Sequence, residues 1–346
     1  MTGSGTGQLA AIFGCAGIEL TSDEQAFFRD TDPFGFILFA RNVESPLQLR
    51  RLTNDLRDAV GRDAPILIDQ EGGRVQRLRA PHWREWNPPL EMVTRSSSPL
   101  RAMWLRSRII AHELRGVGID ANCAPCADIA VEETHPFLKS RCYGFDSDTV
   151  LQVSEAVADG LLSGGVLPVI KHLPGHGRAM SDSHLNLPTV AEPIEILRKT
   201  DFVPFRGLND LPMAMTAHIV FSSIDENAPA TQSLEMIRVI REDIGFSGLL
   251  MTDDLNMQAL SGSLGTRTEA AMAAGCDIAL HCKGDLDEMR AVAAACGGQS
   301  IDTRSRARAA LSARRTPDPV DIEALEAELR HLMVDRGRGP MAEADV

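Results

Sequence analysis

Residues 171–184 concentrate side chains that can handle protons. The run reads Lys-His-Leu-Pro-Gly-His-Gly-Arg-Ala-Met-Ser-Asp-Ser-His, so it holds three histidines and one aspartate within fourteen residues. Asp182 and His184 can share a hydrogen bond across the intervening serine, which would fix the imidazole tautomer and raise its basicity. A histidine that titrates near ~6.5 gives and takes protons at neutral pH. The pair therefore predicts a general acid/base, while a turn-capping aspartate beside a surface histidine explains the same residues equally well.

The same histidines could instead hold a metal ion. Their spacing differs from two histidines on one helix turn with a carboxylate, and Pro174, Gly175 and Gly177 make the segment a loop. We therefore predict no metal and no cofactor. A metal-dependent barrel hydrolase stays open as an alternative, which unchanged activity after exhaustive chelation would remove. Its candidate ligands are His172, His176, His184 and Asp253.

Further polar residues follow short apolar runs, at the point where each run ends. A single polar residue at such a place is often only a turn or cap former. Charged groups that arrive at one rim from five different runs are costly to crowd together unless they pair with one another or with a ligand. Their convergence predicts a functional site. These residues are Asp69, Glu71, Arg74, Asn122, Asp128, Lys171, His172, His218, Asp253, Asp254, His281 and Lys283.

The apolar runs themselves predict a parallel sheet. They are near-continuous rather than alternating, as expected of strands buried on both faces, and helix-period stretches separate them. Eight strands that alternate with helices can close into a barrel, whose active site lies at the carboxyl ends of the strands. An open doubly wound sheet is the main competitor, but no Gly-rich phosphate turn follows the first run. The runs are Ala11–Gly14, Gly35–Phe39, Pro65–Ile68, Ile119–Ala121, Val166–Ile170, Pro212–Thr216, Gly248–Met251 and Asp277–Leu280.

We therefore predict the α/β class and a single (β/α)8 TIM-type barrel within residues 1–315. Helices are expected over Leu49–Val60, Val150–Leu161 and Leu234–Ile244, where apolar residues recur at helical spacing. Residues 316–346 form a tail. Its amphipathic segment, Val320–Met333, is expected to pack outside the barrel as a short helix.

Composition narrows the classes of function. The chain has 346 residues, a formal net charge of −13 and no basic stripe, so nucleic-acid binding is not expected. No apolar run approaches the ~18–20 residues that span a bilayer, and no Lys or Arg precedes Arg29 to form a signal-peptide n-region. Seven cysteines, of which only Cys123 and Cys126 are closely spaced, predict small buried thiols in a reducing compartment. We expect a cytoplasmic protein that binds neither nucleic acid nor membranes.

Several long motifs resemble those of one known family. The segment from Lys171 through His184 is similar to the signature loop of the bacterial β-N-acetylhexosaminidases of glycoside hydrolase family 3. The resemblance covers essentially the whole predicted barrel and implies a single-domain cytoplasmic enzyme of cell-wall (peptidoglycan) recycling. Such enzymes remove terminal N-acetylglucosamine from muropeptides, GlcNAc-β-1,4-anhydro-MurNAc-peptides. The further motifs are Gly35-Phe-Ile-Leu-Phe-Ala-Arg-Asn42, Ile68-Asp-Gln-Glu-Gly-Gly-Arg-Val-Gln-Arg77, Ser140-Arg141 and Gly248-Leu-Leu-Met-Thr-Asp-Asp-Leu255.

The resemblance also implies residue roles. The nucleophile falls on Asp253, and the acid/base falls on His184 with Asp182 as its partner. Cys142-Tyr143 stands where the family pattern has Ser-Phe, a local departure beside Arg141. The implied partner is the sugar substrate, and we expect a monomer or a weak homodimer. The implied sugar-binding residues are Asp69, Arg77, Arg141, Lys171 and His172.

These residue types suit a retaining glycosidase. Such an enzyme needs a carboxylate to attack the anomeric carbon and a second group to protonate the departing oxygen. The second group is usually a carboxylic acid about 5–5.5 Å from the first. Here His184 takes its place, and we expect the loop to close before the proton is delivered.

Four residues near the rim have other expected roles. Glu71 is expected to cap the turn that Gly72 and Gly73 make, rather than to bind substrate. Asp254 is expected to point away from Asp253, because neighbours on a strand face opposite sides. His176 and His218 either line the pocket or are satisfied structural histidines.

Three other functions stay open. A phosphorylase would open the same glycosyl intermediate with phosphate, which a histidine acid/base does not repel, and sugar 1-phosphate would be its product. A broad β-glucosidase typically takes its acid/base from an additional domain, for which we expect no room. A non-catalytic sugar-binding barrel needs no nucleophile. An aromatic content of 5% with three Trp favours a short pocket for one sugar over a long cleft.

Overall fold

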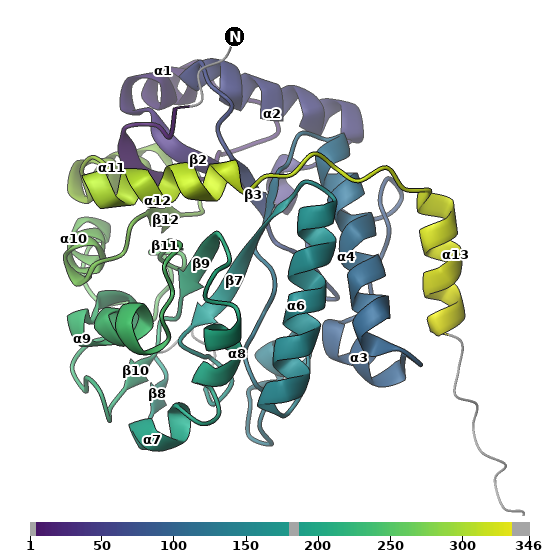
Figure 1. Ribbon diagram of the computed structural model, residues 1–346. Helices are drawn as coiled ribbons and strands as arrows, with labels where there is room; N and C mark the ends of the chain where they lie inside the picture. Colours follow the sequence, from purple (N-terminus) through teal and green to yellow (C-terminus); the bar gives the residue numbers. More distant parts are fainter. Residues whose placement is uncertain (1–4, 180–186, 334–346) are drawn as a thin grey trace, which may run out of the picture.

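A computed structural model gives the structure of the protein, and it describes residues 5–179 and 187–333. Its centre is a sheet of eight parallel strands surrounded by helices (Figure 1). The strand order is β11-β9-β7-β6-β3-β2-β1-β12, so neighbours in the sheet follow one another along the chain. The strands are β1 (Leu9–Phe13), β2 (Pro33–Leu38), β3 (Ile66–Ile68), β6 (Ala121–Asn122), β7 (Leu167–Leu173), β9 (Met213–Thr216), β11 (Leu249–Met251) and β12 (Ala279–His281).

The two edge strands of this sheet meet and close it. Met251 pairs with Ile278 in a parallel bridge, and the Thr252 amide donates to the Ile278 carbonyl at 3.0 Å. The Asp277 amide donates to the Leu250 carbonyl at 2.8 Å. The predicted α/β class and (β/α)8 barrel are confirmed, and each of the eight predicted runs contains or overlaps one strand.

Helices pack around the outside of the barrel. The predicted helix over Leu49–Val60 is confirmed as part of α2: Ser45 caps it, Pro46 is its first residue, and Gly61 ends it in the left-handed conformation. The predicted stretch Leu234–Ile244 forms α9 followed by one π-helical turn (Val239–Asp243) rather than one regular helix. The helices are α1 (Ser22–Thr31), α2 (Pro46–Val60), α3 (Pro89–Arg95), α4 (Pro99–Gly116), α5 (Pro136–Lys139), α6 (Ser147–Ser163), α7 (Ile194–Leu197), α8 (Phe202–Gly207), α9 (Leu234–Arg238), α10 (Leu264–Ala274), α11 (Leu286–Cys296), α12 (Ile301–Ser312) and α13 (Ile322–Leu332).

The strands bury both faces, which explains their near-continuous apolar sequences. In β1, Ile12 belongs to a cluster that gathers alternate residues from the strands and fills the barrel. Phe13 belongs to a second cluster, in which the outer faces of the strands pack against the helices. Ala307 and Ala310 of α12 join the interior cluster. Helix α12 therefore packs against the barrel interior rather than only on the outer ring.

A short hairpin follows β3 and carries part of the rim. Its strands, β4 (Gln70–Gly72) and β5 (Val75–Gln76), pair antiparallel. Gly72 and Gly73 turn the chain with φ values of 106° and 59°, a region that favours glycine. A Cβ on Gly72 would also overlap the guanidinium of Arg106. A second two-stranded sheet pairs β8 (Thr189–Val190) with β10 (Val220–Phe221).

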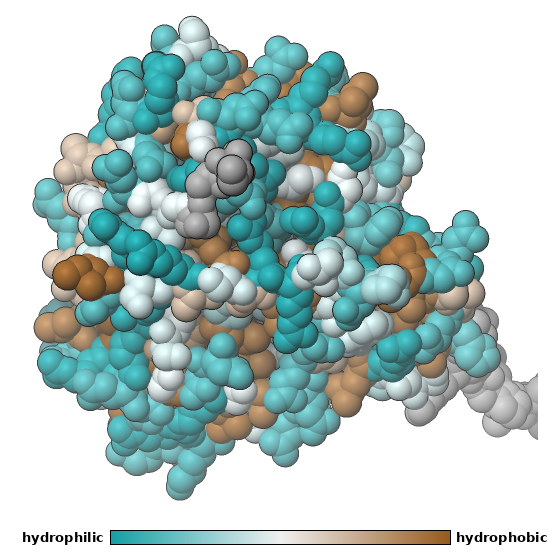
Figure 2. All heavy atoms as spheres, turned by 45° about the horizontal axis from the view of Figure 1, so that its top comes forward, coloured by the Kyte–Doolittle hydropathy of each residue, from teal (hydrophilic) through white to brown (hydrophobic). Residues whose placement is uncertain are grey.

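The C-terminal helix α13 lies beside α4. Arg101 and Glu328 form a two-point ion pair at 2.7 and 2.8 Å, and Leu329 is buried. The division of the chain at residue 315 stays a proposal. The seven cysteines are buried and free, as predicted. No helix within residues 5–179 and 187–333 combines the length and apolar character needed to cross a bilayer. On the face shown in Figure 2, hydrophilic side chains predominate and hydrophobic ones form scattered groups.

Candidate active site

A cavity of about 250 Å³ lies at the carboxyl ends of the strands. Its walls combine charged groups with apolar ones, including Ile37, Phe39, Met257 and Leu280. Asp182 and His184, the predicted acid/base pair, lie outside the described residues. The structure brings the other six predicted site residues to this one cavity: Asp69, Arg77, Arg141, Lys171, His172 and Asp253.

Asp69 follows the last residue of β3 and lies between two cations. Its carboxylate accepts from Lys171 Nζ at 2.8 Å and from Arg77 Nη2 at 2.9 Å. Burial acts to raise the pKa of Asp69, but the charges of Lys171 and Arg77 outweigh it and hold that pKa well below its usual value. Asp69 is therefore an ionised acceptor with lone pairs left for sugar hydroxyls.

Glu71 holds two cations that line the cavity, Arg141 and Lys171. Its carboxylate accepts from Arg141 Nε and Nη2, both at 2.9 Å, and also pairs with Lys171. Burial opposes ionisation, but the Arg141 and Lys171 charges lower the pKa of Glu71 to about 2. The expectation that Glu71 caps the Gly72-Gly73 turn is wrong. The ion pairs hold the carboxylate because a buried charge requires a partner of opposite charge.

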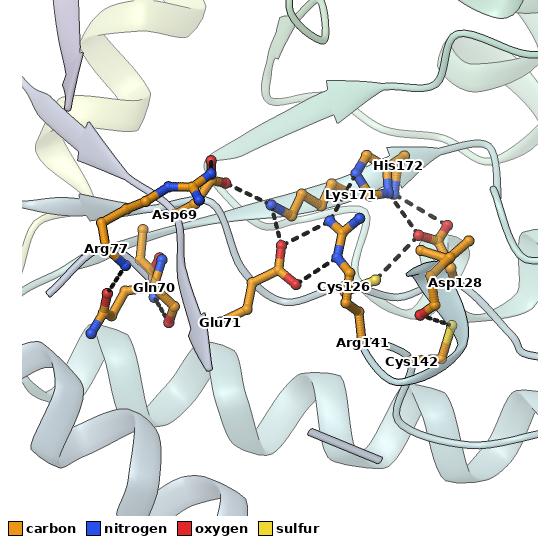
Figure 3. Close-up of polar contacts among 12 residues, drawn as sticks. Asp69, Gln70, Glu71, Arg77, Cys126, Asp128, Arg141, Cys142, Lys171 and His172 are labelled. Atoms are coloured by element: carbon orange, nitrogen blue, oxygen red, sulfur yellow. Dashed lines mark hydrogen bonds and ion pairs between the residues drawn. The ribbon is translucent and has the colours of Figure 1, made fainter. Parts of the chain in front are cut away.

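His172 forms an Asp–His pair with Asp128, a residue to which we assigned no role from sequence. The His172 Nδ1 to Asp128 Oδ2 distance is 2.7 Å, and the other Asp128 oxygen accepts from the His176 amide at 2.7 Å. Arg141 Nη2 lies 3.4 Å from His172 Nε2. Because a guanidinium only donates, this contact requires Nε2 to accept and Nδ1 to carry the proton. Figure 3 shows these contacts as one chain that runs from Asp69 through Lys171, Glu71 and Arg141 to His172 and Asp128.

Asp253 and Asp254 follow β11 and both line the cavity. Asp254, which was expected to point away from Asp253, lines the same cavity, and its Oδ1 accepts from the amides of Asn256 and Cys282 at 3.2 and 3.1 Å. The Asp254 amide donates to Asp253 Oδ1 at 2.8 Å. Burial opposes ionisation of Asp253, but His218, His172 and this amide lower its pKa. Mainly burial raises the pKa of Asp254 to about 6.

The sequence of the chain also matches a known protein family over most of its length. Residues 5–310 match the model of the glycosyl hydrolase family 3 N-terminal domain, a range that contains every residue of the cavity. The chain belongs to glycoside hydrolase family 3. It is therefore a glycoside hydrolase, and the resemblance inferred from its motifs is confirmed.

Individual proteins and solved structures are also similar over most of the chain. A protein named β-hexosaminidase from Bordetella pertussis is 34% identical over 284 residues, which are 79% of this chain and 80% of that protein. The structure of NagZ from Neisseria gonorrhoeae in complex with N-trifluoroacetyl-D-glucosamine has a TM-score of 0.82 at 27% identity, covering 95% of this chain and 99% of that one. A family 3 β-N-acetylglucosaminidase from Paenibacillus sp. has a TM-score of 0.79 at 28% identity, covering 96% of this chain but 64% of that one.

Several residues of this family 3 site had no predicted role. Asp128 belongs among them, and its place shortly after the fourth strand was the only signal in the sequence. Phe39 also lines the cavity, beneath the Arg77 guanidinium at 5.1 Å. His176 lines the cavity, whereas His218 is satisfied by the Thr231 hydroxyl at 2.8 Å and the Asp254 carbonyl at 3.0 Å.

One group of side chains in the family 3 site could hold a cation. Cys126, Asp128 and His172 place their ligand atoms within 4.8 Å of one another. Hydrogen bonds explain this group, since Cys126 Sγ donates to Asp128 Oδ2 at 3.2 Å. A cation on His172 Nδ1 would move the ring proton to Nε2, where it would face the Arg141 guanidinium. The donor set therefore fits a hydrogen-bonded pair better than a metal centre.

The raised pKa of Asp254 has a consequence for stability. The carboxyl has a pKa of about 6 in the folded protein against 3.8 as the ordinary value. The folded state therefore binds more protons than the unfolded state between these values, so stability falls as pH rises through this window, by about 3 kcal/mol. We expect Asp254→Asn to abolish this pH dependence. The free energy of unfolding of the variant should therefore increase relative to that of wild type between pH ~4 and ~6, as measured by urea unfolding. If the free energies of unfolding of wild type and variant changed with pH in parallel, the raised pKa would not belong to Asp254.

Proposed function

We propose that this family 3 hydrolase is a retaining exo-β-N-acetylglucosaminidase, with Asp253 as nucleophile and an Asp182–His184 general acid/base. The observation that carries the proposal is the position of Asp253. It is half-buried, its pKa is lowered, and it lines a cavity that also presents Asp69, Lys171 and His172. Relatives named β-hexosaminidase and β-N-acetylglucosaminidase support the choice of an N-acetylated amino sugar.

In the proposed reaction, Asp253 attacks the anomeric carbon while His184 protonates the departing oxygen. A covalent glycosyl-enzyme forms, and His184 then takes a proton from water as that water releases the sugar. Asp253 suits the first step because an ionised carboxylate also stabilises the oxocarbenium-like transition state. His184 lies outside the described residues, so its role rests on the motif that carries it.

The remaining cavity residues would hold the sugar. Asp69 would accept hydrogen bonds from hydroxyls, and Lys171 and Arg77 would donate to them. His172 would offer an imidazole held in one tautomer by Asp128, and Arg141 would approach the acetamido side. At about 250 Å³ the cavity falls just below the ~300 Å³ lower bound of typical small-molecule pockets, which favours a single terminal sugar.

We propose muropeptides as the substrate, in peptidoglycan recycling in the cytoplasm. Arg74 supports an aglycone that carries carboxylates: it is exposed and lies over the ring of Phe137, a residue of the cavity wall, at 4.1 Å. A guanidinium at the edge of the site can bind a carboxylate of the lactyl-peptide part. Seven free buried thiols suit a reducing compartment.

The direct test is to trap the intermediate. A 2-fluoro or 5-fluoro glycosyl reagent should label the enzyme with one equivalent of sugar, and peptide mapping should place the label on Asp253. Release of N-acetylglucosamine from a purified GlcNAc-anhydro-MurNAc-peptide tests the substrate separately. A label on another carboxylate would overturn the nucleophile, and formation of sugar 1-phosphate in phosphate buffer would instead support a phosphorylase.

The acid role of His184 makes a prediction about leaving groups. We expect His184→Gly to slow hydrolysis of natural disaccharides by about 10²–10⁴-fold, the usual contribution of acid catalysis. Aryl glycosides with good leaving groups should lose much less, because their oxygen departs without a proton. Equal losses on both substrates would show that His184 is not the acid.

Chelation tests the metal-dependent alternative. We expect exhaustive dialysis against a chelator to leave kcat and KM unchanged, because the cavity already supplies an ionised nucleophile and cationic groups. A loss of activity that returns only with added divalent cation would overturn the proposed mechanism.

A further inference from the structure

A second cavity lies at the opposite end of the barrel from the candidate active site. Its volume is about 370 Å³. Gln8, Asp32 and Arg62 each lie at or before the start of β1, β2 or β3, so the cavity is at the amino ends of these strands. Two residues of α12 complete it. The lining residues are Gly5, Thr6, Gly7, Gln8, Asp32, Arg62, Arg304 and Arg308.

This cavity is basic in a protein with a net charge of −13. Three arginines line it against one aspartate, Asp32, which pairs with Arg62 at 2.8 Å between Nε and Oδ1. Arg304 makes one long contact, to the Gln299 carbonyl at 3.4 Å. Arg308 has no hydrogen bond or ion pair within residues 5–179 and 187–333. Within the described part of the chain, Arg304 and Arg308 therefore have no counter-ion.

The two arginines of α12 are neighbours on the helix, and both are exposed. Arg304 and Arg308 are four residues apart on one helix, where side chains are neighbours and like charges repel. Thr6 provides a third polar group that lacks a partner. The residue is 4% exposed, and its hydroxyl makes no hydrogen bond in the described part of the chain. An anion with several oxygens would satisfy both guanidiniums and this hydroxyl together.

We propose that this cavity binds the phosphate group of a small, polar organic phosphate of sugar-phosphate size. The guanidiniums and the Thr6 hydroxyl hold the phosphate oxygens. The volume of about 370 Å³ lies within the range of small-molecule sites and leaves room for the organic part. Glycine and glutamine line that space, which suits a hydroxylated molecule rather than an apolar one.

Calorimetric titration of the full chain tests this proposal, with inorganic phosphate and glucose 6-phosphate as probes at constant ionic strength. We expect saturable binding of both, with the sugar phosphate tighter. Arg304→Ala and Arg308→Ala should each weaken binding by roughly tenfold, because each removes a charge-assisted hydrogen bond. The control Arg238→Ala, an exposed arginine of α9, should bind as wild type.

Three results would overturn the proposal. One is no saturable binding of either probe by wild type. Another is equal weakening by Arg238→Ala, which would indicate general screening. The third is an affinity for phosphate that the sugar does not improve, which would exclude an organic phosphate. The unfolding temperature of Arg308→Ala without ligand should not fall, since the substitution removes a like-charge contact.

Discussion

Replacing Asp253 by asparagine should abolish turnover while leaving the fold and sugar binding in place. We expect kcat to fall by about 10⁴-fold or more, the scale seen when a residue of a hydrolase's catalytic group is removed. Asparagine keeps the shape and the Oδ1 acceptor for the Asp254 amide, but it removes the charge that attacks C1. The measurement is kcat on an aryl N-acetylglucosaminide, with product binding followed in parallel.

The neighbouring carboxyl is the matched control for this substitution. Asp254 lines the same cavity and is adjacent in sequence, but its Oδ1 accepts from the backbone amides of Asn256 and Cys282, which gives this carboxyl a structural role that asparagine can also fill. Asp254→Asn should therefore retain far more activity than Asp253→Asn. If the two variants lost activity equally, or if Asp254→Asn were the slower one, the nucleophile would be misassigned.

The barrel was predictable from sequence because the residues within each strand are enough to identify it. Each strand is buried on both faces, so runs such as Val166–Ile170 are apolar without alternation, and glycine or proline marks many of their boundaries. Helix ends such as Ser45-Pro46 depend on neighbouring residues only. The π-helical turn of residues 239–243 was not predictable, because its apolar spacing is also that of a regular helix.

The partners of the buried charges were not predictable in the same way. Glu71 and Arg141 are 70 residues apart, and Asp128 and His172 are 44 residues apart. No local pattern identifies such pairs, so a glutamate beside two glycines was interpreted as a turn cap. Strand ends did indicate that Asp69, Lys171, His172 and Asp253 meet at the rim, whereas Arg77 and Arg141 were predicted only by the family resemblance; all six share one cavity.

Replacing Glu71 by glutamine should strongly destabilise the protein, because it leaves the buried Arg141 charge without its partner. We expect the free energy of unfolding to fall by about 3–5 kcal/mol, as for other buried ion pairs that lose one member. The pKa of Glu71 supports a similar size: a fall from 4.5 to about 2 corresponds to about 3 kcal/mol. Urea unfolding at pH 7 measures the effect, and kcat/KM should also fall as Arg141 loses its anchor.

The pH dependence and a surface control separate this effect from a general loss of stability. Because folding lowers the pKa of Glu71, its contribution is full above pH ~4.5 and is lost as the pH falls towards ~2, so wild type and Glu71→Gln should converge in acid. The matched control is Glu85→Gln, which removes an exposed partner of Arg79 at 2.8 Å and should change stability by less than about 1 kcal/mol. Equal effects of the two substitutions would mean that Glu71 holds no buried charge in place.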